Sequence, residues 1–352
     1  MTKRLRYGII GAGSNAEKKH VQGYKNLPEV EFAAVCDSNA ERAAEMAKRH
    51  CIPGIYTNYK EMIEREKLDL VSVVTPNFLH AEIVEYALLH GVHVHCEKPL
   101  CTTVEEAERI LSAKERSGKR VMIGLNNRFT NEAVYLKQWI DAGHLGTIYS
   151  AKAGWVRRSG IPGRGTWFTN RKLSGGGVMI DLGTHYLDLC LYMMGMPEPS
   201  YMAGAAYRNF VDSTSRNRNG YKGDEQGVFD VEDTAEGYLR LANGASVMFE
   251  FSWASNIEQD QHYIELRGTK GGASLKNGEL RIFGEHEGVC VDLQPKLYAD
   301  VKRQDEFRHF IDCLLDEGRE LMAPPEDGLI LAKLAEAFYA SAETKQPVVL
   351  RT

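Results

Sequence analysis

The sequence predicts an α/β protein, in which a doubly wound parallel sheet is followed by a C-terminal α/β domain with a large, mainly antiparallel open sheet. Three observations predict this fold class. A glycine-rich turn joins an apolar strand to a helix near the N-terminus, strands and helices alternate to about residue 125, and strands joined by short turns dominate the remainder. The length of 352 residues also favours two domains, because one domain takes roughly 150 residues.

The composition is that of an ordinary globular protein. Hydrophobic residues make up 43% and charged residues 26% of the chain, and the net charge is −5. This charge argues against a nucleic acid or an anionic membrane as a partner. No run approaches the ~18 apolar residues of a membrane span, and the N-terminus has no apolar signal-peptide core. We therefore expect a cytoplasmic protein.

Cysteine and histidine spacing gives no metal site. The seven cysteines are scattered and include no Cys-x-x-Cys pair, which favours reduced thiols over a disulfide framework or a zinc site. His93 and His95 alternate on one predicted strand, but no third ligand is spaced near them. Polar residues near a strand end are the favoured interpretation over metal ligands, and we predict no bound metal.

The first chemical signal is a glycine-rich turn between a strand and a helix. Leu5–Ile10 is apolar and runs into Gly11–Ala16, and a helical pattern follows to about Leu27. In this context Gly-x-Gly-x-x-Ala predicts a dinucleotide-binding turn. The first glycine permits the tight turn, the second lets backbone amides approach a pyrophosphate, and the alanine lets the helix pack on the strand. The predicted cofactor contacts in this turn are Gly11, Ala12, Gly13, Ser14 and Asn15.

A second predicted strand, Glu31–Asp37, ends in an acid. An acid at this position accepts hydrogen bonds from the adenosine ribose hydroxyls and repels a 2′-phosphate. Ser38 follows it, and no arginine comes directly after the acid to offset that repulsion. We therefore predict NAD rather than NADP as the cofactor, with Asp37 and Ser38 among its contacts. The alternative is that Asp37 only caps the helix that starts near Asn39.

Strands and helices then alternate as in βαβ units, which implies a parallel sheet of the Rossmann type with six strands. The further helices are predicted at 40–50, 58–65, 81–90 and 104–117, and the further strands at 68–74, 92–96 and 120–125. Ligands of such sheets bind outside the carboxyl ends of the strands. Residues that follow two of these ends are therefore predicted cofactor contacts, namely Thr75, Pro76, Asn77, His80, Glu97 and Lys98.

Lys98 is the residue on which the predicted chemistry depends. Pro99 has no N–H and a fixed φ, so the strand that ends at Cys96 cannot continue through it. The lysine is thereby held at the C-terminal tip of a strand. The Lys-Pro bond is a candidate for cis geometry. The alternative interpretation of such a lysine is a surface side chain that caps a strand.

Beyond residue 125 the pattern changes to strands joined by turns such as Ala242–Gly244 and Lys276–Gly278. The strands are predicted at 147–157, 199–207, 234–241, 245–252, 262–268, 272–276 and 279–283, and the helices at 132–142, 179–194, 305–317 and 327–341. We predict an NAD-binding domain over residues 1–125 and a substrate-binding and oligomerisation domain over residues 126–352. The last helix is expected to pack back on the first domain.

The helix after Gly175–Gly177 carries the second chemical signal. Asp181, His185 and Asp188 are spaced i, i+4 and i+7 and are expected on one face, opposite apolar residues. A histidine beside two carboxylates is costly to bury without a partner or a purpose. It is either a satisfied core histidine or, together with Lys98, part of a proton-transfer site that combines a base, an orienting carboxylate and a cation.

Two loops allow more than one interpretation. Residues 156–168 are rich in glycine and arginine and contain an aromatic pair, which suits recognition of a polyol by Arg158 and Trp167. The alternative is a solvated turn that Trp167 anchors. Residues 209–230 are polar and long for an idle connection. They are interpreted either as a lid or as an oligomer contact.

In order and spacing, Gly11-x-Gly13-x-x-Ala16, Glu97-Lys98-Pro99 and Asp181-x-Gly183-x-His185 resemble the Gfo/Idh/MocA family of glucose–fructose oxidoreductase-like and inositol dehydrogenase-like enzymes. The resemblance covers essentially the whole chain. It implies a Rossmann domain, an α/β domain whose open sheet often mediates dimers or tetramers, and action on a sugar or cyclitol hydroxyl by Lys98, Asp181 and His185. Some members have tyrosine in place of His185, which here resembles the inositol- and pyranose-dehydrogenase-like branch.

The resulting hypothesis is an NAD-dependent oxidoreductase that converts a ring secondary alcohol of a sugar, glycoside or cyclitol to a ketone. In this hypothesis His185 takes the hydroxyl proton, Asp181 orients His185 or binds a neighbouring hydroxyl, and Lys98 binds the reacting oxygen. The predicted substrate contacts are Lys98, Arg128, Arg158, Trp167, Asp181 and His185, of which Arg128 follows Asn127 where many family members have a second arginine. Two alternatives are a glycoside hydrolase that uses NAD transiently and a non-catalytic dinucleotide or sugar sensor.

Overall fold

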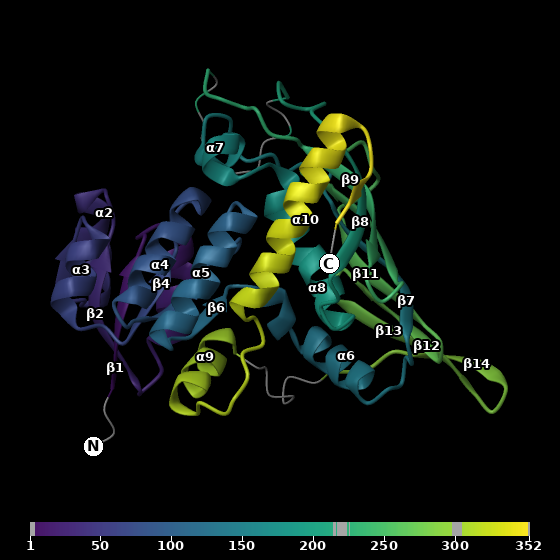
Figure 1. Cartoon of the computed structure of the whole chain (residues 1–352), viewed down its shortest axis with the longest axis horizontal. Helices are drawn as coiled ribbons and strands as arrows, with labels where there is room; N and C mark the ends of the chain where they lie inside the picture. The colour runs from purple at the N-terminus through teal and green to yellow at the C-terminus, as the bar shows by residue number, and fades with distance from the viewer. Residues whose placement is uncertain (1–3, 214–215, 217–223, 225, 298–304, 351–352) are drawn as a thin grey trace. The chain divides into compact units, whose positions relative to one another are not determined.

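The computed structural model describes residues 4–213, 216, 224, 226–297 and 305–350. The chain, drawn in Figure 1, divides into two compact units. Unit 1 is Met1–Leu125 with Gln304–Leu329, and unit 2 is Asn126–Arg303 with Ile330–Thr352. Unit 1 is therefore built from two segments that are far apart in the sequence. The assignment of a function to each part of the chain stays a prediction.

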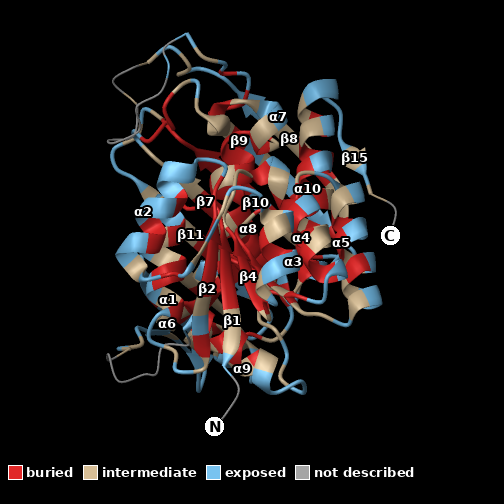
Figure 2. Ribbon diagram, turned by 90° about the vertical axis from the view of Figure 1, so that its left-hand side faces the viewer, coloured by how far each residue is buried: buried red, intermediate tan, exposed pale blue. Residues whose placement is uncertain are grey.

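Unit 1 contains a parallel sheet of six strands in the order β3-β2-β1-β4-β5-β6. The strands are β1 Leu5–Ile10, β2 Val30–Cys36, β3 Gly54–Tyr56, β4 Leu70–Val73, β5 His93–Cys96 and β6 Val121–Ile123. The central strands β1, β2 and β4 are mostly buried, as Figure 2 shows. The strand order reverses between β1 and β4, the place where sheets of this kind bind ligands. The doubly wound parallel sheet is confirmed.

The helices of unit 1 connect the strands of this sheet, except α9, which follows the strands of unit 2 in the sequence. They are η1 Ala16–Val21, α1 Gln22–Tyr24, α2 Ala40–His50, α3 Tyr59–Glu66, η2 Asn77–Leu79, α4 His80–Leu89, α5 Val104–Ser117 and α9 Glu306–Leu315. The last helix, α10 Pro325–Thr344, begins in unit 1 and continues in unit 2. Side chains cap four of these helices. The capping residues are Asn39 for α2, Asn58 for α3, Thr103 for α5 and Asp305 for α9. The helices predicted at 40–50 and 104–117 have the predicted bounds.

Two local features of unit 1 differ from the prediction. Strand β3 has only three residues, too few for an alternation pattern to reveal it. The first helix does not run as an α-helix to Leu27, because Ala16–Val21 is π-helical and the α-helical turn after it ends at Tyr24. A π turn is wider than an α turn. The consecutive residues Lys19 and His20 of this turn both bind the carboxylate of Glu97.

Unit 2 contains a sheet of nine strands in the order β14-β13-β12-β11-β7-β10-β9-β8-β15. The strands are β7 Ile148–Val156, β8 Pro199–Tyr207, β9 Thr234–Leu241, β10 Ser246–Ser252, β11 Gln261–Gly268, β12 Gly271–Lys276, β13 Glu279–His286, β14 Val289–Leu293 and β15 Val348–Val349. Only the β7–β10 pair is parallel among its described neighbours. The mainly antiparallel sheet is confirmed. The edge strands β14 and β15 differ from the prediction, because β14 has no buried face and β15 has only two residues.

Helices cover one face of the nine-stranded sheet. The helices of unit 2 are η3 Asn126–Phe129, α6 Asn131–Asp141, η4 Trp167–Thr169, α7 Arg171–Ser174, η5 Met179–Gly183, α8 Thr184–Met193 and the greater part of α10. Of these, η5, α6, α8 and α10 pack against the sheet. The core lies between this face and two of the helices, where Leu187 of α8 and Phe338 of α10 join Phe249 of β10. The open face carries apolar side chains such as Tyr238 and Met248, which are cross-strand neighbours with 39% and 57% exposure.

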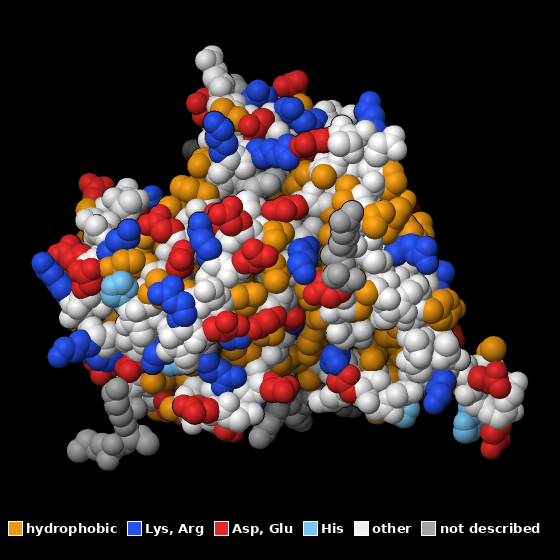
Figure 3. Space-filling model, viewed as in Figure 1, with side chains coloured by type: hydrophobic (Ala, Val, Ile, Leu, Met, Phe, Trp, Pro, Cys, Tyr) orange, Lys and Arg blue, Asp and Glu red, His pale blue; other side chains and the backbone are white. Residues whose placement is uncertain are grey.

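The outer surface mixes charges of both signs. On the face drawn in Figure 3, lysine and arginine side chains are interspersed with aspartate and glutamate. Within the described part of the chain, no helix combines the length and the apolar character that crossing a membrane requires.

A buried ion pair joins η3, at the start of unit 2, to helix α8. Arg128 Nε donates to Asp188 Oδ2 (2.9 Å), Nη2 donates to Oδ1, and both side chains are about 1% exposed. The guanidinium also lies 4.5 Å from the centroid of the Tyr192 ring. The sequence pattern predicted Asp188 on one face with Asp181 and His185. The structure instead gives Asp188 a partner in the core.

Breaking this pair is expected to destabilise unit 2. Arg128→Met leaves the carboxylate of Asp188 buried without its cation, which costs about 3–5 kcal/mol for buried pairs in general. We expect the free energy of unfolding, measured with urea and circular dichroism, to fall by that order in Arg128→Met. The double change Arg128→Met/Asp188→Leu should recover much of the loss. The control is Arg158→Met at an exposed arginine, and equal stability of the two single variants would contradict the structural role.

Two histidines of unit 1 accept hydrogen bonds from backbone amides and are therefore neutral. His93 Nδ1 accepts from the N–H of Arg120 (3.0 Å), and His309 Nε2 accepts from the N–H of Met322 (3.1 Å). Burial, reinforced by nearby cationic side chains, lowers the pKa of each histidine to about 4.

Unit 1 is accordingly expected to lose stability on mild acidification. A histidine in the unfolded chain has a pKa of about 6.5, so between pH 6.5 and 4 the unfolded state binds protons that the folded state does not. The free energy of unfolding should be greatest above about pH 6.5 and fall as the pH is lowered. The double variant His93→Asn/His309→Gln keeps an acceptor near each position without titrating. Its urea unfolding should change less between about pH 7.5 and 5; an equal change in both proteins would count against this account.

Candidate functional site

The glycine-rich turn after β1 is shaped for close approach. Gly11 N–H donates to the carbonyl of Cys36 (2.8 Å), and its φ is +96°. A Cβ on Gly11 would lie 2.3 Å from the carbonyl oxygen of Val74, whereas a Cβ on Gly13 would meet no atom within 4 Å. The protein's own backbone therefore requires glycine at the first position. At Gly13 the missing side chain leaves open space that suits a pyrophosphate, and Ala16 behind it is fully buried.

The carboxylate of Asp37, after β2, is held by backbone donors. Its Oδ2 accepts from the N–H of Ala12 (2.8 Å) and its Oδ1 from the N–H of Asn39 (2.9 Å). The cap of α2 is Asn39 rather than Asp37. Arg42, in the first turn of α2, lies 3.6 Å from Asp37 Oδ2 and is about half exposed. Arg42 comes five positions after Asp37, beyond the directly following residues on which the prediction of NAD rests.

The residues after β4 also lie where a ligand of this sheet would bind. Thr75 Oγ1 is a buried atom that has no hydrogen-bond partner in the described ranges, and a bound ligand would satisfy it. Asn77 is buried and Pro76 is half-buried. His80 is buried and lies between two carbonyl oxygens, with Nδ1 at 2.6 Å from Pro99 O and Nε2 at 2.8 Å from Thr75 O. His80 thus joins the ends of β4 and β5, a contact that the sequence did not reveal.

These features fit a dinucleotide. The turn offers open space at Gly13, Asp37 offers a fixed carboxylate, and Thr75 offers an unsatisfied hydroxyl. The remaining predicted contacts in this part of unit 1 are exposed, namely Ser14, Asn15 and Ser38. The contacts of each residue with a cofactor stay predictions.

Glu97 is buried at the end of β5 and binds two side chains from η1. Its Oε1 accepts from Lys19 Nζ and from His20 Nε2, each at 2.9 Å. Burial alone would raise the pKa of Glu97, but the Lys19 charge and the His20 hydrogen bond hold that pKa well below its ordinary value. Lys98 follows and is half-buried, and the Lys98–Pro99 peptide bond is cis. The side chain of Glu97 is therefore engaged within the protein, and its predicted cofactor contact stays a prediction.

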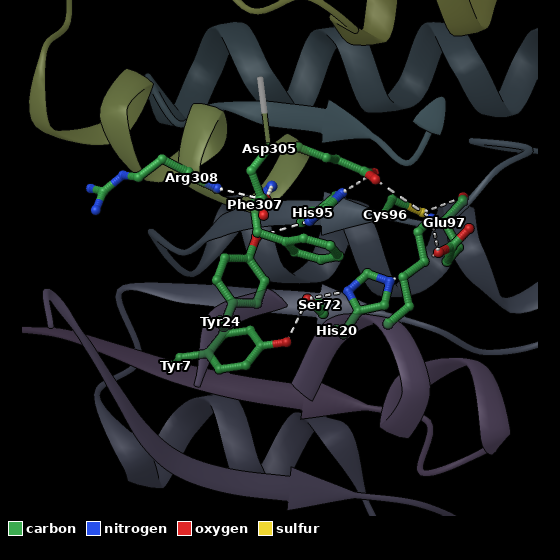
Figure 4. A network of polar contacts seen from close by, with 12 residues as sticks. Tyr7, His20, Tyr24, Ser72, His95, Cys96, Glu97, Asp305, Phe307 and Arg308 are labelled. Atoms are coloured by element: carbon green, nitrogen blue, oxygen red, sulfur yellow. Dashed lines mark hydrogen bonds and ion pairs between the residues drawn. The ribbon is translucent and has the colours of Figure 1, made fainter. Parts of the chain in front are cut away.

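A chain of hydrogen bonds continues from Glu97 into the core of unit 1 (Figure 4). The Tyr7 hydroxyl donates to Ser72 Oγ (2.7 Å). The Ser72 hydroxyl is then left to donate to His20 Nδ1 (2.9 Å), so the ring proton is on Nε2 and points to Glu97. His20 is therefore neutral, and burial lowers its pKa to about 4.

A second branch begins at the same lysine. Lys19 Nζ lies 3.6 Å from Glu306 Oε2, and Glu306 Oε1 lies 3.1 Å from His95 Nε2. The other ring nitrogen of His95 is 2.8 Å from the Tyr24 hydroxyl. His93 and His95 have separate protein partners. Over the described ranges, no group of three or more His, Cys, Asp or Glu side chains is arranged to hold a metal ion.

In unit 2 the predicted catalytic helix begins with the π-helical turn η5, which contains Asp181. The Nε1–H of Trp253, a fully buried side chain, donates to Asp181 Oδ2 (2.9 Å). The start of η5 is capped by the buried carboxylate of Glu232, which accepts from the N–H groups of Gly177 and Met179 at 3.0–3.1 Å. A Cβ on Gly177 would lie 2.0 Å from the carbonyl of Glu232, so this close approach requires glycine.

His185 lies one helical turn after Asp181, in aromatic surroundings. It is half-buried, and its ring centroid is 5.9 Å from that of Trp155 on β7. The next residue, Tyr186, is hydrogen-bonded through its hydroxyl to Nδ1 of His262 on β11. The guanidinium of Arg157 lies 4.5 Å from the centroid of the Trp155 ring. The structure therefore places the predicted base where α8, β7 and β11 meet.

The remaining predicted substrate residues are found in unit 2. Arg128 is buried against Asp188, whereas Arg158 is exposed, with its N–H on Asp260 (2.7 Å) and its Nη1 on the carbonyl of Glu258 (3.2 Å). Trp167 is half-buried and stacks on its neighbour Phe168 at 3.8 Å between ring centroids. Within the predicted loop 209–230, positions 214–215, 217–223 and 225 lie outside the described residues. The substrate roles of these residues and of the loop stay predictions.

Four side chains that contact predicted site residues were missed from the sequence, namely Lys19, His20, Arg42 and Trp253. Glu232, which caps the turn that contains Asp181, was missed as well. For some of these residues, the position in the sequence could have marked them as candidates. Trp253 comes directly after a predicted strand, where side chains can reach a ligand site. Lys19 and His20 lie in the first turns after the glycine-rich turn. Nothing in the local pattern marks Glu232.

Comparison with protein families covers both units. Residues 5–125 match the Gfo/Idh/MocA oxidoreductase family with an NAD-binding Rossmann fold, and residues 137–350 match the C-terminal α/β domain of that family. D-glucoside 3-dehydrogenase of Escherichia coli (strain K12) is 34% identical over 349 residues, which cover 98% of this chain and 97% of the relative. Levoglucosan dehydrogenase of Pseudarthrobacter phenanthrenivorans is 28% identical over 76% of this chain and 73% of its own.

Solved structures of other proteins have the same fold as this chain. Levoglucosan dehydrogenase in complex with NADH and levoglucosan superposes with a TM-score of 0.86 at 23% identity, over 99% of this chain and all of the other. Crystallised GenD2 from gentamicin A biosynthesis, in complex with NAD, gives a TM-score of 0.79 at 22% identity, over 100% of this chain and 98% of the other. At these identities the likeness supports the fold alone. Family match, near full-length similarity and fold together show that the chain belongs to the Gfo/Idh/MocA family of NAD-binding oxidoreductases.

Proposed function

We propose that this protein is an NAD-dependent dehydrogenase that oxidises a secondary ring hydroxyl of a sugar, glycoside or cyclitol to a ketone. The observation that carries the proposal is its similarity to D-glucoside 3-dehydrogenase over nearly the whole of both chains. The name of levoglucosan dehydrogenase supports the same substrate class. The chain also keeps the proton-transfer set of Lys98, Asp181 and His185, which a sensor without chemistry does not need.

In the proposed reaction His185 takes the proton of the reacting hydroxyl. Asp181, whose carboxylate the indole of Trp253 fixes at 2.9 Å, orients His185 or binds a neighbouring hydroxyl. The ammonium of Lys98 donates to the reacting oxygen and offsets the charge that develops there. Bound NAD supplies the acceptor for the hydride.

The dinucleotide is proposed to bind along the carboxyl ends of the strands of unit 1. Gly11 and Ala12 line the turn with amides that donate within the protein, the backbone amides at Gly13–Asn15 face the pyrophosphate, and Asp37 and Ser38 contact the adenosine ribose. Thr75, Pro76 and Asn77 are proposed to line the nicotinamide side, where the unsatisfied Thr75 hydroxyl supports a ligand contact. His80, Glu97 and Lys98 complete the proposed cofactor set.

We further propose a homodimer or homotetramer that forms through the open face of the nine-stranded sheet. Exposed apolar neighbours on that face, such as Tyr238 and Met248, support an interface. Residues 1–125 are proposed to bind NAD and residues 126–352 to bind substrate. A cytoplasmic location is supported by free thiols, two of which, Cys51 and Cys290, are exposed.

The function is tested with purified protein, NAD and a panel of inositols, hexoses, sugar acids and glycosides, while NADH absorbance is followed. We expect NADH to form with one substrate class. If no substrate of the panel gives NADH although the protein binds NAD, the proposal of a dehydrogenase is overturned. Release of an aglycone without net NADH would then indicate the hydrolase, and no reaction at all would indicate the sensor.

The proposed roles make a specific kinetic prediction. Lys98→Ala and His185→Asn each remove a group that acts on the transferring proton or the reacting oxygen, so kcat should fall by roughly 10²–10⁴-fold. Circular dichroism should show an unchanged fold in both variants. His90→Asn changes an exposed histidine and is the control. Near-full activity of Lys98→Ala would refute the assignment.

A further inference from the structure

The three residues Glu97, Lys98 and Pro99 end strand β5, and the structure anchors both neighbours of Lys98. On one side, the carboxylate of Glu97 binds Lys19 and His20. On the other side, the carbonyl of Pro99 lies 2.6 Å from Nδ1 of the buried His80. Lys98 itself is half-buried between these two anchored residues.

The first anchor is rigid because it is buried and crowded. Glu97 is 7% exposed, and a Cβ on Gly124 would come within 3.1 Å of its Oε2. Oε2 therefore packs against the chain after β6, while Oε1 accepts from two donors of η1. Lys19 Nζ also forms an ion pair with Glu306 Oε2, at 3.6 Å. Loss of its ammonium would leave two buried carboxylates without a cation, which neighbouring groups cannot replace at low cost.

The second anchor ties two strand ends together. His80, at the start of α4, reaches the carbonyls of Thr75 and Pro99 with its two ring nitrogens. A neutral imidazole donates to one of these carbonyls, and an imidazolium donates to both. Either form holds the chain after β5 against the chain after β4. The direction in which Lys98 leaves the strand is thus set by buried contacts on both sides.

From these contacts we propose that Lys19 and His80 are positioning residues, which hold Glu97 and Pro99 in place and thereby fix the reach of the Lys98 ammonium toward the substrate oxygen. The inference rests on the proposed function, because it assigns both side chains to the same catalytic lysine. Neither residue touches the reacting atoms in this scheme. A displacement of about 1 Å of a catalytic group can lower a rate roughly 10²-fold.

The test compares kcat, expressed per NADH-binding site, among Lys19→Met, Lys19→Arg, His80→Phe and His80→Gln. Lys18→Met is the matched control, since Lys18 is the exposed neighbour on the same turn. We expect Lys19→Met and His80→Phe each to lower kcat roughly 10–100-fold. Lys19→Met should do so with little change in the affinity for NADH. Lys19→Arg and His80→Gln keep a donor and should recover much of the rate, and Lys18→Met should match the unchanged protein.

The decisive comparison repeats Lys19→Met and His80→Phe in the Lys98→Ala background. If both act through Lys98, their effect on the residual rate should shrink to less than about 2-fold. A merely structural role would lower the rate by the same factor in both backgrounds, and that result overturns the proposal. Circular dichroism identifies a variant that has not folded, and the variant at the other position then decides the comparison.

The pH profile gives an independent readout. The Lys19 charge lowers the pKa of both His20 and Glu97, so in Lys19→Met both groups should protonate at higher pH. The acid limb of the kcat profile is expected to move to higher pH in Lys19→Met and to stay in place in Lys18→Met. Equal profiles would count against the proposal.

The two proposals fail in different ways. If the unchanged protein turns over no sugar or cyclitol, the proposed function is overturned and the positioning role with it. If the unchanged protein is active and Lys19→Met is equally active, the positioning role alone is overturned.

Discussion

Unit 1 depends on one ammonium group shared by two buried carboxylates. Lys19 lies between Glu97 of the β5 end and Glu306 of α9, and His20 and His95 each form a hydrogen bond with one of these carboxylates. Buried ion pairs add little net stability, because each charge gives up its hydration. However, any arrangement that leaves one of these buried charges without its partner has a much higher free energy. The network therefore favours one arrangement of η1, β5 and α9. This arrangement also fixes the position of the chain at Lys98, which directly follows Glu97.

The sequence predicted what is local and could not predict what is distant. Gly11, Asp37 and the Glu97-Lys98-Pro99 segment were found because each follows a strand whose apolar pattern is visible. The same rule predicted both sheet types, since βαβ alternation and short turns are local patterns. The partners of these residues come from elsewhere in the chain: Lys19 precedes Glu97 by 78 positions and Trp253 follows Asp181 by 72. No periodicity records such a contact, because packing alone decides it.

The two π-helical turns explain a further limit of the sequence argument. One follows the glycine-rich turn and the other contains Asp181, so both occur in the segments with predicted chemistry, as π turns often do. Face assignments by i, i+4 and i+7 assume α-helical spacing. That assumption grouped Asp188 with Asp181, whereas Asp188 is bound to Arg128 in the core. A local widening of the helix cannot be recognised from residue types.

Because unit 1 is built from two segments, its folding cannot be completed until a late stage of synthesis on the ribosome. Lys19 and His95 emerge early, but their partner Glu306 belongs to the segment Gln304–Leu329. At about 5–20 residues per second, the chain between Leu125 and Glu306 takes roughly 10–40 s to synthesise. During that interval the nascent sheet carries polar side chains that lack their final neighbour. Completion of unit 1 thus waits until the segment Gln304–Leu329 has been translated.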